Sequence, residues 1–189
     1  MTDADLVAAA AAGDGDAAGT LVRRHYEECW QFAFRMLGNR HDAEDVVQET
    51  FLRALRALGR YREQDRFRAW LFRILTNTCR TALLQRRRRK HWFLSVDSHA
   101  LDRLAGPGEP PRDMMVELSR ETALAATLRC AALRLDAKHR EAFLLKYGAG
   151  MSYTEMAEAT GAGVSALKMR VKRACDALRP ILCEVLDDL

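Results

Sequence analysis

The sequence predicts an all-α fold of two helical blocks joined by a linker. Its 189 residues include only 4 prolines and 7% aromatics, and a chain rich in Ala, Leu and Arg favours helix over strand. Apolar residues recur at helical spacing on both sides of residues 92–113. That stretch contains GPGEPP, which no helix tolerates. No segment alternates apolar and polar residues well enough to predict a strand.

The first block holds three expected helices. The periodicity predicts them at about 17–37, 42–58 and from Phe67 into RRRRK at 86–90. The first ends at the Gly38-Asn39 turn, Asp42 is expected to cap the second, and Gly59 stops it. Residues 1–16 form an N-terminal extension with no assigned role. A helical domain is expected at 17–91, and a flexible linker follows at 92–113.

The second block is a helical domain at 114–189. We expect a helix from Arg120 to Leu135, then a short helix capped by Asp136. Ser152 and Glu155 have the spacing of a capping box, in which each side chain bonds the other residue's backbone amide. Two further helices are expected at 153–161 and from Ser165 past Leu178.

The last two helices have the pattern of a helix-turn-helix. In SYTEMAEATGAGVSALKMRVKR (152–173), Gly161 stands where the turn needs a left-handed backbone, and Ala157 is small where two helices cross. Leu167 and Val171 face inward, whereas basic and small residues face outward. Such a face suits a DNA major groove, and a hairpin packed only for stability is the alternative. The candidate DNA-contacting residues are Ser165, Ala166, Lys168, Met169, Arg170, Lys172 and Arg173.

The charge is distributed very unevenly. The net charge is +4, yet residues 51–91 hold 13 basic and 2 acidic side chains. This is the footprint of a nucleic-acid contact, and a solvated basic face is the alternative. Aromatic rings alternate with arginines from Tyr61 onward, as single-stranded nucleic acid requires. For Phe67, a place in the core is at least as consistent as a base contact.

An acidic helix precedes the basic region. The segment HDAEDVVQETFLRAL covers residues 41–55. On a helical wheel its apolar residues form one face, and Leu52 stands alone on the other, among Asp45, Gln48 and Glu49. This arrangement predicts a docking surface for a basic protein partner. A helix face that is merely solvated is the alternative.

Other functional classes find little support. The five cysteines form no CxxC pair, so we expect buried free thiols in a reducing, cytoplasmic environment. His25 and Cys29 are four residues apart, but two ligands make weak evidence for a metal. No apolar run can span a bilayer, and no catalytic constellation or P-loop is present. We therefore expect no cofactor, no metal, no membrane insertion and no enzymatic activity.

The combined motifs resemble a bacterial RNA polymerase sigma factor of the extracytoplasmic-function (ECF) group of the sigma-70 family. LGNRHDAEDVVQETFLRALRAL, FRAWLFRILTN and the basic run look like sigma domain 2. LRLDAKHREAFLLKYGAGMSYTEMAEATGAGVSALKMRVKRACDALRPIL looks like sigma domain 4. The two motifs stand in the family's order and cover most of the chain.

The resemblance implies a function for each motif. Asp45, Gln48, Glu49 and Leu52 would bind the β′ clamp helices of core RNA polymerase, which also contacts sigma through its β subunit. The second domain would read the promoter −35 element as duplex. The −10 element would be bound and melted by Tyr61, Phe67, Arg68, Trp70, Arg73, Asn77 and Arg80.

The sequence thus predicts an alternative sigma factor that directs core polymerase to specific promoters. Its partners would be core RNA polymerase, promoter DNA and, by resemblance, an anti-sigma factor. A stand-alone helix-turn-helix regulator of duplex DNA is the alternative. That alternative leaves the aromatic basic region and the Leu52 surface without a role.

Overall fold

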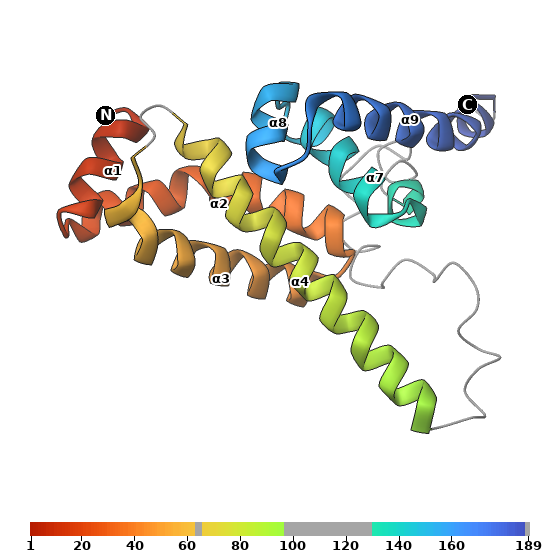
Figure 1. Ribbon diagram of the computed structural model, residues 1–189, viewed down its shortest axis with the longest axis horizontal. Coiled ribbons are helices and arrows are strands. Elements are labelled where there is room, and N and C mark those ends of the chain that lie inside the picture. The colour runs from red at the N-terminus through yellow and green to blue at the C-terminus, as the bar shows by residue number, and fades with distance from the viewer. Residues whose placement is uncertain (63–65, 97–129, 188–189) are drawn as a thin grey trace.

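The structure, a computed structural model, describes residues 1–62, 66–96 and 130–187, and every regular element in these ranges is helical (Figure 1). The predicted all-α fold is confirmed. Residues 97–113 of the expected linker and 120–129 of the expected helix lie outside the described ranges.

The N-terminal extension, for which the sequence predicts no role, forms a helix. Helix α1 spans Asp3–Ala11. Thr2 and Asp5 form a capping box, in which the Asp5 amide donates to Thr2 Oγ1 at 3.2 Å and the Thr2 amide donates to Asp5 Oδ2 at 2.8 Å. Leu6 and Val7 are buried. The helix therefore packs an apolar face onto its neighbour α2.

Helices α2 (Gly15–Leu37) and α3 (Arg40–Ala57) form a hairpin. Gly38 separates them in a left-handed conformation with φ of +70°, which a residue without Cβ adopts at no steric cost. The cap of α3 is Asn39 and not Asp42, because the helix begins earlier than expected. The Asn39 side chain accepts a hydrogen bond of 2.9 Å from the Asp42 amide.

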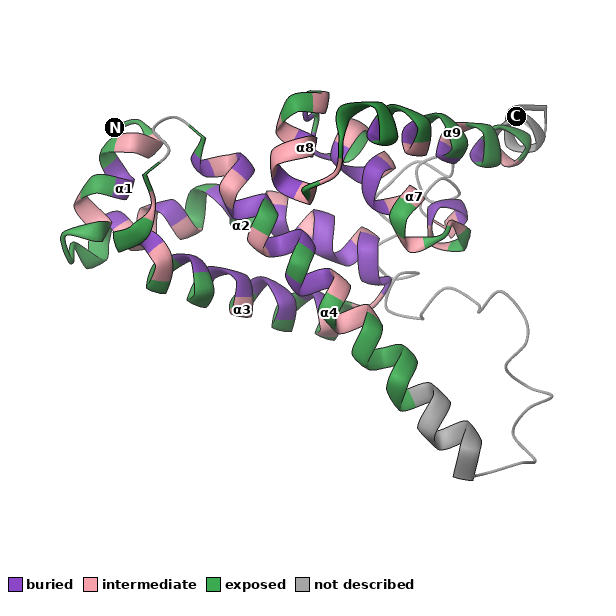
Figure 2. Cartoon of the chain, in the orientation of Figure 1, coloured by how far each residue is buried: buried purple, intermediate pink, exposed green. Residues whose placement is uncertain are grey.

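Helix α4 (Phe67–Val96) is central to the molecule. A 3-10 turn, η1 (Leu58–Arg60), and a short loop lead into it. It continues past the predicted RRRRK segment at 86–90 into residues 92–96, the start of the expected linker, where no Gly or Pro interrupts it. Its buried positions face α2 and α3 on one side and α8 on another (Figure 2).

The second block contains the predicted helix-turn-helix. Asp136 caps α7 (Ala137–Phe143), as expected, and a π turn, η4 (Leu144–Gly148), follows. The capping box of Ser152 and Glu155 begins α8 (Tyr153–Thr160), and both of its hydrogen bonds are formed. Gly161, with φ of +70°, makes the turn into α9 (Val164–Asp187).

The two blocks pack against each other, with α8 lying across α4 (Figure 1). The Thr76 hydroxyl of α4 donates to the Ala159 carbonyl of α8 at 3.1 Å. Arg140 Nη1 of α7 donates to the Met36 carbonyl at the end of α2 at 2.7 Å. The apolar core runs continuously from Leu6 to Val171. The described helices therefore form one packed body.

Candidate functional site

Helix α3 presents the acidic face that the helical wheel predicts. Its apolar side is buried, from Ala43 to Ala54. On the opposite side Asp45 and Gln48 are exposed, Glu49 is half-buried, and Leu52 is 41% exposed. Glu49 accepts a hydrogen bond of 2.6 Å from Arg53 Nε, one turn later. The four predicted docking residues thus share one surface.

The apolar part of this surface is larger than the sequence reading proposed. Leu55 is 37% exposed, one turn beyond Leu52, and Tyr26 of α2 is exposed beside the buried Phe51. The spacing of Leu52 and Leu55 could have revealed the second leucine. Tyr26 lies on another helix, so only the packing of α2 on α3 brings it near.

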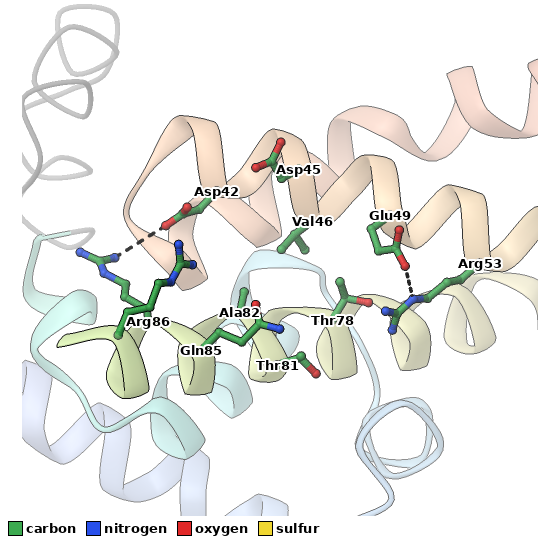
Figure 3. Close-up of a pocket in the computed structure, with 11 residues that line it drawn as sticks. Asp42, Asp45, Val46, Glu49, Arg53, Thr78, Thr81, Ala82, Gln85 and Arg86 are labelled. Carbon is green, nitrogen blue, oxygen red and sulfur yellow. Dashed lines mark hydrogen bonds and ion pairs between the residues drawn. The ribbon is translucent and has the colours of Figure 1, made fainter. Parts of the chain in front are cut away.

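A groove of about 230 Å³ separates the acidic face of α3 from the basic face of α4. Figure 3 shows Asp42, Asp45 and Glu49 on one wall and Gln85 and Arg86 on the other. The Arg86 guanidinium lies 4.0 Å from the Asp42 carboxylate. The acidic wall on α3 and the basic wall on α4 therefore face each other across this groove, and the Asp42–Arg86 ion pair joins them.

A histidine adds a titratable group to the acidic face. His41 Nδ1 lies 3.3 Å from the Asp45 carboxylate. A hydrogen bond with its own backbone and the negative charge of Asp45 raise the pKa of His41 above its ordinary value. Protonation of His41 as the pH falls therefore reduces the net negative charge of this surface.

Three predicted aromatic residues meet where the chain enters α4. The ring centroids of Tyr61 and Trp70 are 5.0 Å apart. Phe67 lies behind both rings, at 6.1 Å from Tyr61 and 5.7 Å from Trp70. Tyr61 and Trp70 are half-buried, whereas Phe67 is 4% exposed. In this conformation Phe67 is a core residue that supports the other two rings.

The predicted arginines and Asn77 follow along α4, and they differ in their partners. Arg73 and Asn77 are exposed. Arg68 is paired with Glu28 of α2 and also donates to the Ala149 carbonyl. Arg80 makes two hydrogen bonds to Glu141 of α7, at 2.8 and 2.6 Å.

The acidic partners of these arginines are not predictable from the sequence. Glu141 is 3% exposed, which is rare for a carboxylate unless it is paired. It lies 61 positions from Arg80, and Glu28 lies 40 positions from Arg68. A third partner, Glu158 of α8, pairs with Arg66. No local periodicity links residues so far apart, so only the fold could identify them.

Helix α9 separates its faces as predicted. Leu167, Val171, Ala174 and Leu178 are buried. The predicted DNA-contacting residues are exposed apart from the half-buried Arg170, and Met169 is 49% exposed. These residues are Ser165, Ala166, Lys168, Met169, Arg170, Lys172 and Arg173. The arrangement presents one small and basic face on the second helix of the motif.

The described residues contain no group of three potential metal ligands, and none of their helices is long and apolar enough to cross a membrane. His25 contacts Asp3 and not a metal-binding cluster. Cys29 and Cys79 are buried free thiols, and burial raises the pKa of both. Cys130 and Cys175 are free but only half-buried.

Family comparisons match both halves of the chain. Residues 21–89 match Sigma-70 region 2, and residues 125–178 match Sigma-70 region 4. Because region 2 is matched as well, a stand-alone helix-turn-helix regulator is not favoured.

Several curated relatives match over most of their length. The ECF RNA polymerase sigma factor SigW of Bacillus subtilis is 31% identical, over 88% of this chain and 89% of its own. The RNA polymerase sigma factor CnrH of Cupriavidus metallidurans is 37% identical over 95% of both chains.

A solved structure agrees with these relatives. CnrH in complex with the cytosolic domain of CnrY superposes with a TM-score of 0.66 at 33% identity, covering 98% of this chain and 97% of that one. The chain thus has two sigma regions in order, relatives that match along almost its whole length, and their fold. It belongs to the ECF group of the sigma-70 family of RNA polymerase sigma factors.

Proposed function

We propose that this protein initiates transcription by binding core RNA polymerase, directing it to specific promoters and helping to melt the −10 region. The observation that supports this most is the presence of separate surfaces in one body. An acidic surface with an apolar centre lies on α3, and basic surfaces lie on α4 and α9. A subunit that joins an enzyme to DNA needs surfaces of both kinds.

The α3 surface is the proposed site for the β′ clamp helices, and the polymerase β subunit is proposed as a further contact. Asp45, Gln48 and Glu49 surround Leu52 there. Their exposure supports the assignment, because a buried apolar anchor within a polar rim is the usual anatomy of a protein interface. Leu55 extends the apolar part of this surface.

The start of α4 is the proposed −10 site. Tyr61 and Trp70 offer partly exposed rings on which unstacked bases can stack, and Arg73 and Asn77 are exposed beside them. Phe67 supports the two rings from the core. Arg68 and Arg80 become available to DNA only when they leave Glu28 and Glu141.

Helix α9 is the proposed reader of duplex −35 DNA. Arginines and lysines on its exposed face suit phosphates and guanine edges, and Ala166 and Met169 suit thymine methyl groups. The capping box begins α8, and the left-handed turn at Gly161 leads from α8 into α9.

The protein is proposed to act without catalysis or cofactor, in the cytoplasm, where it meets RNA polymerase. We also propose an anti-sigma factor as a regulatory partner. The structure of CnrH with the cytosolic domain of CnrY supports a protein partner for this fold.

Reconstitution with core RNA polymerase tests the proposed function. The purified protein and core enzyme should together transcribe from a subset of promoters in genomic DNA fragments, and neither should do so alone. Open-complex formation is measured by permanganate reactivity of thymines. Tight binding to duplex DNA with no polymerase binding would overturn the proposal.

A further inference from the structure

The proposed base-stacking rings rest on a support that reaches back to the N-terminus. Phe67 contacts Tyr61 and Trp70, and it also contacts the ring of His25, with centroids 5.3 Å apart. His25 is 6% exposed, so its ring is enclosed by the core. Tyr61, Trp70, Phe67 and His25 therefore form one connected group, called the aromatic cluster below.

The polar edge of His25 has a single partner among its described contacts, and that partner is in α1. His25 Nε2 lies 2.9 Å from Asp3 Oδ2. The other carboxylate oxygen of Asp3 accepts a hydrogen bond of 2.5 Å from Arg24, and Arg24 also donates to the Met1 carbonyl. A buried ring nitrogen needs such a partner, since an unsatisfied polar group in the core is costly.

The contacts of α1 fix the position of Asp3. Its capping box and the buried Leu6 and Val7 fix it on α2, and it also contacts η1 and α4 on either side of the loop that carries Tyr61. Asp3 is the first residue of the helix and lies before the segment that matches Sigma-70 region 2.

We propose that Asp3 is a positioning residue for promoter melting: through His25 it fixes the aromatic cluster whose outer rings receive unstacked −10 bases. This inference rests on the proposed function of that cluster. Aromatic pairs hold a preferred distance and tilt, so a shift of His25 moves Phe67 and, with it, Tyr61 and Trp70. The Asp3–His25 contact thus makes α1 part of the −10 site, although α1 itself does not have to contact DNA.

The direction in which Asp3→Ala changes the affinity for −10 DNA distinguishes a positioning role from a purely electrostatic one. Replacing Asp3 with Ala removes a negative charge, which by itself strengthens binding to a polyanion. Positioning predicts the opposite for −10 DNA, because the cluster loses its support. The duplex −35 probe contacts α9, so positioning predicts no loss there.

The test compares variants of the full-length protein assembled with core RNA polymerase. The probes are a labelled single strand from the −10 region and a labelled duplex from the −35 region of a promoter that the wild-type holoenzyme transcribes. Asp3→Ala should weaken single-strand binding about tenfold, the loss expected when one base stack is compromised. Permanganate reactivity should fall with it, and core binding and −35 binding should not weaken.

Three controls sharpen the result. Asp3→Asn keeps an oxygen that can accept from His25, so it should restore most single-strand binding. Arg24→Ala removes the other partner of Asp3, and after correction for its salt dependence it should bind like wild type. Asp16→Ala makes the same charge change at an exposed site on α2 and should show no loss.

The possible outcomes are distinct. Wild-type or tighter single-strand binding by Asp3→Ala overturns the inference, as does an equal loss for both probes or for core binding, which would mark a purely structural role. Failure of the wild-type protein to direct transcription would instead overturn the proposed function.

Discussion

Leu52 and Leu55 are the exposed large apolar side chains of α3, where the remaining ones are buried. Exposure of these leucines to water is unfavourable. A basic partner with an apolar patch could bury the leucines and pair with the carboxylates around them in one interface. The helical wheel was enough to find Leu52, because helical spacing alone decides which side a residue occupies.

We expect Leu52→Asp to weaken binding to core RNA polymerase by about thirtyfold or more, the loss typical of an interface hot spot. Folding should be unaffected, because the side chain is exposed. Fluorescence-detected binding to core enzyme and thermal unfolding measure the two effects. Leu84→Asp is the matched control, since Leu84 is 56% exposed on α4 outside the α3 surface. Equal losses in both variants would refute the docking assignment.

Local signals in the sequence predict most of the helices. The capping box of Ser152 and Glu155, the cap at Asp136 and the turn at Gly161 are read from neighbours in sequence, and all are present. Helix α1 was missed because its alanine-rich segment shows little helical pattern, and its burial depends on α2. Packing against another helix is the part of stability that local pattern does not report.

The capping box makes a pH-dependent contribution to stability. Hydrogen bonds from the backbone and side chain of Ser152 lower the pKa of Glu155 below its ordinary value of 4.5. A lowered pKa means that the contribution is present above the ordinary value and is lost as pH falls through the value in the folded protein.

We therefore expect Glu155→Gln to be less stable than wild type at neutral pH, with the difference shrinking on acidification. Ser152→Ala should cost about 1 kcal/mol, as N-cap removals do. Urea unfolding at several pH values measures both. Thr154→Ala, exposed in the same turn, is the control. A difference for Glu155→Gln that grows as pH falls would contradict this account.

The contacts between α4 and the second block include a residue proposed to bind DNA. Arg80 is paired with Glu141 of α7, and nearby Thr76, which is not a proposed DNA contact, is hydrogen-bonded to α8. The sequence predicted two helical blocks but not this packing, because its contacts join residues 61 and 83 positions apart. An arginine cannot hold a carboxylate and a phosphate in the same geometry, so DNA at the proposed −10 site would have to compete with Glu141 for Arg80.

We expect Glu141→Gln to raise the affinity of the free protein for single-stranded −10 DNA several-fold, because it releases Arg80. Fluorescence anisotropy over a range of salt concentrations measures the effect. Glu27→Gln, the same charge change at an exposed position of α2, gives the part due to net charge alone. If both variants gain equally, Arg80 is not restrained by Glu141.

The arginine–glutamate pairs also affect how the sequence can diverge. If the proposed −10 site is right, Arg68 and Arg80 are each constrained both by an acidic residue in the folded chain and by a phosphate in the promoter, whereas the exposed Arg73 is constrained by the promoter alone. Losing Glu28 or Glu141 would remove one of these two constraints and leave a half-buried arginine without its acidic partner. Across descendants of this chain, positions 28 with 68 and 80 with 141 should therefore change as couples, and position 73 should change independently.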